Sequence, residues 1–346
     1  EQGRGPCRAR NECQKGCSFG AYFSTQSSTL PAAIETGNLT IATNSIVHSV
    51  IYDEGTNRAT GVRIIDSETQ EQREYFGKVV FLCASTLGTT QIMLNSVSKD
   101  FPNGIANSSG VLGHYLTDHC YNAGATADIE GFEDEYYSGR RPTSLYMPRF
   151  QNIVEQNPEF LRGYALTGGA QREEWYRFSG QAGFGKGFKD QIKNAGSWKF
   201  ELRASGEMLP RFENKVTLHA SKKDKWGIPQ LHFDCAYSDN EKRMMKHAAE
   251  TAGEILENIG LKNVNTWTSE SPMGLVIHEM GTARMGKDPK TSILNGNNQC
   301  HDIANLFVTD GACMASSAWQ NPSLTFMALT ARACKFAVEE LKSGRI

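Results

Sequence analysis

The sequence has no long apolar run, no strong excess of either charge and no glycine-rich dinucleotide turn. No apolar run approaches the ~20 residues that a helix needs to cross a bilayer. The formal net charge of −2 argues against nucleic acid or an anionic membrane surface as the main partner. No Gly-x-Gly-x-x-Gly motif follows an expected strand, so the sequence lacks the turn that would hold a dinucleotide pyrophosphate.

Length and composition indicate a large folded unit. The 346 residues exceed the roughly 250–300 at which one hydrophobic core usually divides, so we expect two domains. A hydrophobic content of 39% and 33 glycines suit an α/β enzyme with many loops. The chain begins at Glu1 without a methionine and passes directly into a loop that contains cysteines. We therefore expect it to be the C-terminal part of a longer enzyme, or one piece of a nicked one.

The most informative segment runs from His278 to Asn321. His278 opens the sequence His-Glu-Met-Gly-Thr-Ala-Arg-Met-Gly, and a short apolar run further on leads into Thr309-Asp310-Gly311. Asn321 is a good N-cap and Pro322 fits the first turn of a helix, which we expect to continue to about Leu341. The N-terminus of such a helix offers unpaired N–H groups and a partial positive charge, and it therefore stabilises an anion.

This arrangement resembles the C-terminal signature of the glucose-methanol-choline (GMC) family of flavin oxidoreductases, in which a histidine and a second histidine or asparagine face the flavin. Three further segments are similar to motifs of that family: 79–90, 113–119 and 214–218. The pattern is most similar to the sugar-oxidising branch, with its pyranose oxidases, FAD-dependent glucoside 3-dehydrogenases and glucose dehydrogenase catalytic subunits. The family's glycine-rich FAD turn, which lies near the N-terminus of a complete member, is missing from this sequence.

The resemblance implies an α/β fold in which a Rossmann-like FAD-binding domain carries an inserted antiparallel-sheet domain for the substrate. The FAD-binding domain would comprise 1–118 and 268–346, with the substrate-binding domain at 119–267. By the same resemblance, the residues that contact FAD would be Val47, Ala84, Ser85, Asp310, Gly311, Asn321, Pro322 and Ser323. For Val47, whose backbone would meet the adenine, simple core packing is an equally good interpretation.

The resemblance also assigns His278 and Asn321 to catalysis. A sugar C–H group gives up hydride only as its hydroxyl loses a proton, so a neutral histidine near that oxygen is a suitable base. Asn321 would hold the same oxygen through its amide and orient the C–H group toward the flavin. The alternative is a capped helix beside an unrelated core histidine.

Three of the nine cysteines lie close together near the start of the chain. Cys7, Cys13 and Cys17 have five and then three residues between them, and such short loops can wrap several thiolates around a metal or cluster. The segment resembles the cysteine loop of FAD-dependent glucose dehydrogenases that carry a [3Fe-4S] cluster, although those proteins have a further cysteine where this chain has Arg8. Packing cysteines or a disulfide are the alternative. Small buried thiols are expected at four other positions: Cys83, Cys235, Cys313 and Cys334.

Hydrophobic periodicity divides the chain into a strand-rich first part and a longer alternating part. Strands are predicted at 39–42, 46–52, 60–65 and 79–84, followed by a helix at 88–95. From about His119 to Trp267, an antiparallel sheet that would form a wall over the flavin is indicated by period-two segments such as 198–202, 215–219 and 230–233. Ser238 begins a capping box, and the helix after it would end at Gly260 with a core stripe of Met244, Ala248, Ala252, Ile255 and Ile259.

Three functions are compatible with these features. A dehydrogenase would oxidise a sugar or glycoside and pass electrons through the cluster to a cytochrome or quinone, with a small accessory subunit as partner. An oxidase would use oxygen instead, and a non-catalytic sugar-binding fragment or subunit would keep only the sheet. We expect the first of these. The aromatic, glycine-rich stretch 175–188 is a substrate loop, a docking loop or ordinary surface. The chain itself does not determine the localisation, and the resemblance favours the periplasm.

Overall fold

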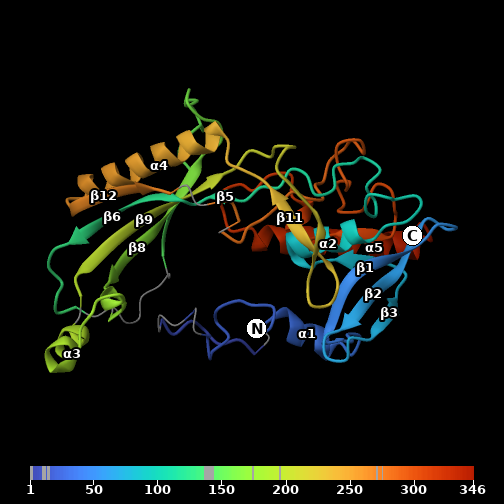
Figure 1. The fold of residues 1–346 in the computed structure, drawn as a ribbon, viewed down its shortest axis with the longest axis horizontal. Helices are drawn as coiled ribbons and strands as arrows, with labels where there is room; N and C mark the ends of the chain where they lie inside the picture. Colours follow the sequence, from blue (N-terminus) through green and yellow to red (C-terminus); the bar gives the residue numbers. More distant parts are fainter. Residues whose placement is uncertain are drawn as a thin grey trace.

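The structure, a computed structural model, describes residues 3–9, 13, 16–135, 144–173, 175–194, 196–269, 272–274 and 276–346. These residues form two lobes that join near strand β5 (His119–Cys120) (Figure 1). One lobe consists of a large sheet covered by a long helix, and the other combines smaller sheets with helices. Within the described ranges, no helix is both long and apolar enough to cross a membrane.

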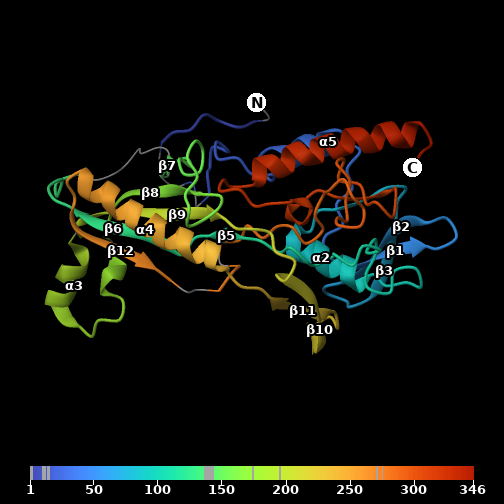
Figure 2. The same cartoon turned by 90° about the horizontal axis from the view of Figure 1, so that it is seen from above.

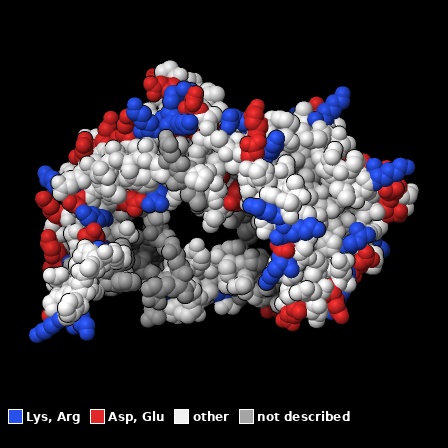
Figure 3. All heavy atoms as spheres, viewed as in Figure 1, with Lys and Arg blue, Asp and Glu red and all other residues white. Residues whose placement is uncertain are grey.

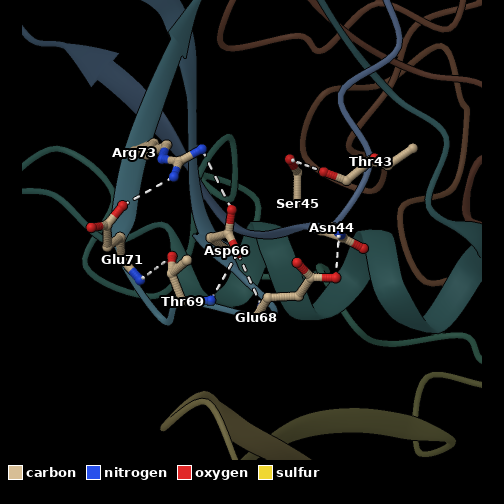
Figure 4. Close-up of polar contacts among 8 residues, drawn as sticks. All are labelled: Thr43, Asn44, Ser45, Asp66, Glu68, Thr69, Glu71 and Arg73. Atoms are coloured by element: carbon tan, nitrogen blue, oxygen red, sulfur yellow. Dashed lines mark hydrogen bonds and ion pairs between the residues drawn. The ribbon is translucent and has the colours of Figure 1, made fainter.

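The first small sheet is an antiparallel meander. Its strands are β1 (Ser45–Asp53), β2 (Arg58–Asp66) and β3 (Gln72–Phe76), paired in that order. Asp66 closes the turn between β2 and β3, because its carboxylate accepts the N–H groups of Glu68 and Thr69 at 3.0 Å each and pairs with Arg73 at 3.4 Å (Figure 4). Asn44 donates to the Glu68 carboxylate at 3.0 Å and so ties the start of β1 to the same turn.

A buried two-stranded parallel sheet lies in the same lobe. Its strands are β4 (Val80–Leu82) and β13 (Leu306–Val308). Strand β4 is followed by α2 (Ser85–Asn95). Strand β13 is followed by the short 3-10 helix η3 (Gly311–Cys313) and then by α5 (Ser323–Lys342). Because the strands are parallel, the segments after them start from one edge of the sheet, where ligands bind in open α/β sheets. Seen from above, α5 runs along one side of the lobe, and the hairpin of β10 (Lys215–Lys223) and β11 (Pro229–Asp234) lies on the opposite side (Figure 2).

The large sheet belongs to the other lobe. Its strands are β5 (His119–Cys120), β6 (Ala123–Ile129), β7 (Leu145–Met147), β8 (Tyr164–Arg172), β9 (Trp198–Glu207) and β12 (Lys262–Thr268), in the order β12-β6-β9-β8-β7 with β5 beside β9. The long helix α4 (Asp239–Asn258) covers one face of this sheet. The capping box predicted at Ser238 is present, with Glu241 as its acidic member. The face opposite α4 borders an opening between the lobes (Figures 1 and 3).

Three smaller features complete the fold. The hairpin of β10 (Lys215–Lys223) and β11 (Pro229–Asp234) forms a two-stranded sheet separate from the large sheet. It contacts α2, and an isolated bridge joins Lys215 to His114. Helix α1 (Thr29–Glu35) lies near the N-terminus. In the glycine-rich stretch 175–188, the 3-10 helix η2 (Trp175–Phe178) precedes α3 (Gly185–Lys193). The structure does not describe the side chains of Trp175 and Tyr176.

Several local predictions are wrong. Of the four thiols expected to be buried, Cys83 and Cys334 are exposed, Cys235 is half-buried and Cys313 is buried. Residues 39–42 are not a strand: no strand of the described part pairs with them, and Leu39 and Ile41 are exposed at 41% and 53%. Ile259 does not belong to the core stripe of α4, because it is the C-cap residue and is 59% exposed. Gly260 follows it with a φ of +85°, the left-handed conformation that ends a helix, as predicted.

Candidate functional site

His278 lies on a loop that a buried carboxylate holds in place. Asp118, which is 1% exposed, accepts N–H bonds from His119 (2.8 Å) and His278 (3.3 Å) at Oδ1, and from Gly274 (3.1 Å) and Val276 (3.3 Å) at Oδ2. The His278 ring is half-buried, and its Nδ1 has no hydrogen-bond partner among the described residues. Burial lowers the pKa of His278, and the nearby negative charge of Asp118 opposes this effect. The neutral imidazole that a base requires is therefore favoured at neutral pH.

A second histidine packs against the first. His119 is 1% exposed, and its ring meets the His278 ring edge to face with the centroids 4.9 Å apart. Neither ring nitrogen of His119 makes a hydrogen bond within the described part of the chain, although the carbonyls of Ala318 and Gly206 are near. Burial, with a contribution from His278, lowers the pKa of His119 to about 4. The two imidazoles are therefore in ring contact without a hydrogen bond between them.

Backbone hydrogen bonds place the His278 loop beside the segment that follows β13. The bonds run from the N–H groups of Gly281, Ala283 and Met285 to the carbonyls of Gly311, Ala312 and Cys313, at 3.1, 2.9 and 2.8 Å respectively. Gly311 has no room for a side chain, since a Cβ there would lie 2.3 Å from Thr86 Oγ1 and 2.6 Å from the carbonyl oxygen of Glu279. The His278 loop, η3 and the first turn of α2 are thus in close contact.

Asp310 connects α2 to η3 through hydrogen bonds of its buried carboxylate. Its carboxylate is 8% exposed and accepts the Thr89 hydroxyl at 2.5 Å and the Ala312 N–H at 2.9 Å. Burial raises the pKa of Asp310. Ala84 and Ser85, at the carboxyl end of β4, are by contrast exposed, and Ser85 has a φ of +65°. Asp310 therefore has a visible role in holding α2 to η3, and the surface open to a ligand lies at Ala84 and Ser85.

The first residues of helix α5, 323–325, are exposed, whereas Pro322 before them is buried. Its N-cap residue is Pro322 and not Asn321 as predicted, because the first helical bond runs from the Phe326 N–H to the Pro322 carbonyl at 3.0 Å. Asn321 and Ser323 are exposed, and the Asn321 amide has no partner among the residues that the structure describes. The shift of one position matters little, since helix ends differ by one or two residues between definitions. The 20-residue helix still presents a free N-terminus.

These features fit an anionic, flavin-type cofactor. The exposed Ala84 and Ser85 follow one parallel strand, and the exposed Asn321 and Ser323 stand at the start of the helix after the other. Backbone N–H groups at a helix N-terminus are suitable donors to an anion. Val47 fits less directly: it is half-buried against the core and opposes Ile64, and the strand is irregular immediately after it. Its contact with an adenine stays a prediction.

The sheet face opposite α4 carries a polar pocket of about 270 Å³. Arg203 lies between the rings of Tyr121 and Trp267, 5.1 and 5.2 Å from their centroids, and donates to the Glu201 carboxylate at 2.8 and 2.5 Å. The pocket also includes Thr167 on β8. A guanidinium held between aromatic faces and paired with a carboxylate offers donors, acceptors and ring surfaces at one place, which suits a hydroxyl-rich ligand.

The segment before Asn321 is anchored on this sheet. The Ser205 hydroxyl of β9 donates to the Trp319 carbonyl at 3.1 Å, and the Arg149 guanidinium lies 4.4 Å from the Trp319 ring centroid. His119 lies close to Ala318 in the same segment. His119 therefore lies against the His278 ring and close to the segment that leads into Asn321.

The three N-terminal cysteines do not form a metal site in the described part of the chain. Cys7 is exposed and Cys13 and Cys17 are half-buried, all as free thiols, and no group of three histidine, cysteine or acidic side chains there is placed to hold a metal ion. Backbone hydrogen bonds, chiefly from Tyr22 and Phe19, lower the pKa of Cys17. As they lie, these thiols do not fit a three-iron cluster, and we derive no chemical step through one.

Two models of one protein family match this chain. The model for the N-terminal part of GMC oxidoreductases matches residues 2–121, and the model for the C-terminal part matches residues 210–330. The chain belongs to the GMC oxidoreductase family. The match at both ends, over more than half of the sequence together, confirms the resemblance and the α/β fold predicted from the motifs.

Known relatives extend this result. The chain is 30% identical over 309 residues to a 2-methyl-1,2-propanediol dehydrogenase of Mycolicibacterium austroafricanum, covering 88% of this chain and 55% of the relative. It is 27% identical over 350 residues to the fructose dehydrogenase large subunit of Gluconobacter japonicus, covering 99% of this chain and 61% of the relative. The solved structure of Aspergillus oryzae formate oxidase superposes with a TM-score of 0.64 at 15% identity, over 91% of this chain and 63% of that one. The chain thus spans little more than half the length of these relatives.

Sequence reasoning missed two residues of the site and a third near it. Asp118 and His119 fall in the segment 113–119, which resembles a family motif but carries no predicted role, and Arg203 lies just beyond the alternating segment predicted at 198–202. An acidic residue before a histidine within an apolar segment was the only available signal for the first pair. The contacts of Arg203 depend on cross-strand register, which alternation within one strand does not determine.

Proposed function

We propose that this chain forms the substrate-facing and part of the flavin-facing portion of an FAD-dependent oxidoreductase that oxidises a secondary hydroxyl of a sugar or glycoside. The observation that carries this proposal is the half-buried His278, fixed by Asp118 and favoured in its neutral form, beside the exposed start of α5. The relatives named above include a dehydrogenase of a 1,2-diol and the large subunit of a fructose dehydrogenase. Adjacent hydroxyl groups are common to these compounds, and the Arg203 pocket offers matching polar groups.

His278 would take the proton of the substrate hydroxyl. Its Nδ1 is buried, so Nε2 is the nitrogen that can face a substrate oxygen. Asn321 would donate its amide N–H to the same oxygen and stabilise negative charge there. Ala84, Ser85 and the first residues of α5 would hold FAD, which when bound supplies the acceptor for the hydride. The walls formed by His119 and the Trp319 segment would keep water from the reacting hydroxyl.

The finer predictions of a dehydrogenase route stay proposals. Electron transfer through a [3Fe-4S] cluster, a small accessory subunit and a cytochrome or quinone acceptor all depend on parts that the described residues do not assemble. A second candidate is an oxidase that uses oxygen directly, which is supported by the similarity to a pyranose 2-oxidase and to a C-glycoside 3-oxidase.

One experiment separates these functions. The complete enzyme that contains this chain is prepared with FAD and mixed anaerobically with a panel of sugars, glycosides and vicinal diols. Loss of the visible flavin absorbance with a sugar or glycoside supports the proposed reaction, and no loss with any of them contradicts it. Rapid reoxidation by oxygen identifies an oxidase. Slow reoxidation by oxygen, with rapid reoxidation by a quinone and iron in the purified protein, identifies the dehydrogenase.

A further inference from the structure

Asp118 is a buried carboxylate whose known partners are all backbone N–H groups. Two of these groups belong to residues 274 and 276, one to His119 and one to His278. Four backbone donors to one carboxylate fix the path of a loop far better than any single bond, and bonds to an ionised acceptor are the stronger ones. The described residues of the loop that carries His278 form no helix or strand, so this carboxylate supplies the hydrogen bonds that fix their path.

His119 is a buried ring with unused nitrogens. Its edge-to-face contact with His278 leaves the His278 ring little freedom to rotate. A buried imidazole whose nitrogens lack partners carries a desolvation cost, and a native structure retains such a group for a reason. Both nitrogens are shielded, so the ring is in no position to exchange a proton with a substrate. Its effect on the reaction must pass through the residue that it touches.

The other charged groups around His278 are few. Glu279 follows it in the chain, and burial raises the pKa of that carboxyl. Glu207 opposes His119 across β5 and β9, is 4% exposed and pairs with Arg162 at 3.6 Å. Asp118 is the charged group whose field acts on His278, where it opposes the effect of burial.

We propose that Asp118 and His119 are positioning residues for His278: the carboxylate fixes the backbone of its loop and the buried ring fixes the orientation of its imidazole. This inference rests on the proposed function, in which His278 is the base. Asp118 acts through its charge and its four hydrogen bonds, whereas His119 acts through its shape. Removal of the ring and removal of the charge should therefore have different consequences.

The variants are made in the complete FAD-loaded enzyme. His119→Ala removes the ring, His119→Phe restores a ring without nitrogens, and Asp118→Asn removes the charge and keeps one acceptor oxygen. His114→Phe is the matched control, since His114 belongs to the same motif but stacks on Phe212, away from His278. Anaerobic flavin reduction by a sugar is followed as a function of pH. The titration of the His278 ring is followed separately by NMR of histidine-labelled protein without substrate, with His278→Gln to assign the signal.

The expected results differ in both readouts. His119→Ala lowers the limiting rate of flavin reduction about 10- to 100-fold, the cost of a misplaced catalytic group, with little change in KM. It also raises the pKa of His278, because water replaces the ring and relieves the burial. His119→Phe recovers most of the rate. Asp118→Asn lowers the rate and moves the His278 titration to lower pH, because the attractive charge is gone. His114→Phe changes neither readout.

Other outcomes overturn the proposal. An unchanged rate and an unchanged His278 titration in His119→Ala contradict a positioning role. Equal losses in His119→Phe and His119→Ala show that the nitrogens take part directly, which also contradicts it. An unshifted titration in Asp118→Asn removes the electrostatic part. If His119→Ala does not fold, His119→Val leaves a smaller hole and gives the same comparison. If the unaltered enzyme reduces no flavin with any sugar, the proposed function fails, and the NMR titrations still decide whether the two residues control His278.

Discussion

The two faces of the large sheet are built from the same strands but differ in burial and polarity. On β9, Leu202 and Ala204 point toward α4 and are almost fully buried, while Arg203 between them points the other way and meets two aromatic rings and a carboxylate. Because side chains alternate along a strand, one residue of shift separates a packing position from a polar one. The covered face therefore supports stability, and the open face, which continues to His119 and the His278 loop, is the one to which we assign recognition and chemistry in the proposed function.

The largest effect is expected for His278, whose loop borders the open face of the sheet. His278→Ala should lower the rate of flavin reduction about 10²–10⁴-fold, the usual range for losing a general base. Flavin content and thermal stability should change little, because the His278 side chain is only half-buried. Rapid mixing of the complete enzyme with sugar measures the rate, and the flavin spectrum controls for FAD retention. An unchanged rate would remove His278 from the mechanism and end the functional distinction between the two faces.

On the covered face, Leu202→Ala should lower the free energy of unfolding by about 2–5 kcal/mol, because it leaves a cavity in a closely packed core. Leu202 is 0% exposed and lies in the cluster that includes Met244 and Ala248 of α4. Denaturant unfolding measures the loss. In the fraction that remains folded, KM for the sugar should be that of the unaltered enzyme, since the side chain points away from the pocket. A large change in KM with little loss of stability would reverse the assignment of the faces.

Lowering the pH should reduce the stability of the protein through His119, on the open face of the sheet. The pKa of His119 falls from 6.5 in the unfolded chain to about 4 in the folded protein. Between these values the unfolded chain binds a proton that the folded protein does not, so stability falls as the pH is lowered from 6.5 toward 4. The expected loss is on the order of 3 kcal/mol. Unfolding measured across this range tests it, and His119→Phe should remove this contribution.

The smallest effect is expected for Arg203, which follows Leu202 on β9. Arg203→Met keeps an apolar stem between Tyr121 and Trp267 and removes the charge. Stability should change by about 1 kcal/mol or less, since Arg203 is partly exposed and such pairs contribute little. The KM for the sugar should rise about 10-fold, the contribution of one lost hydrogen bond to a charged group. An unaltered KM would show that the pocket on this face does not receive the substrate.

The residues that could be predicted from the sequence are those whose roles depend on local patterns. Alternation predicted β1 and β2, a capping box predicted α4, and an apolar run before an asparagine and a proline predicted α5. The motifs around His278 and Asp310 were sufficient to recognise the family, which the matches confirm. The assignments of His278 and Asn321 to catalysis and of the exposed residues to FAD stay predictions.

The contacts that could not be predicted depend on distant parts of the chain. His119 meets His278 across 159 positions of sequence, and Asp118 binds four N–H groups that no periodicity marks. The strand predicted at 39–42 had the right composition but no neighbouring strand in the described part, and a strand needs a partner for its backbone groups. The cluster suggested by the spacing of the cysteine loop stays a prediction, because no group of three possible metal ligands occurs among the described residues.

The most direct test of the account is the pH dependence of flavin reduction in the complete enzyme and in His278→Ala. Because burial lowers the pKa of His278, the account predicts a rate that is constant near neutral pH and falls only below about pH 6.5 as the imidazole becomes protonated. In His278→Ala this fall should disappear while the residual rate stays low. The same fall with acid in the variant would show that another group is the base and would contradict the account.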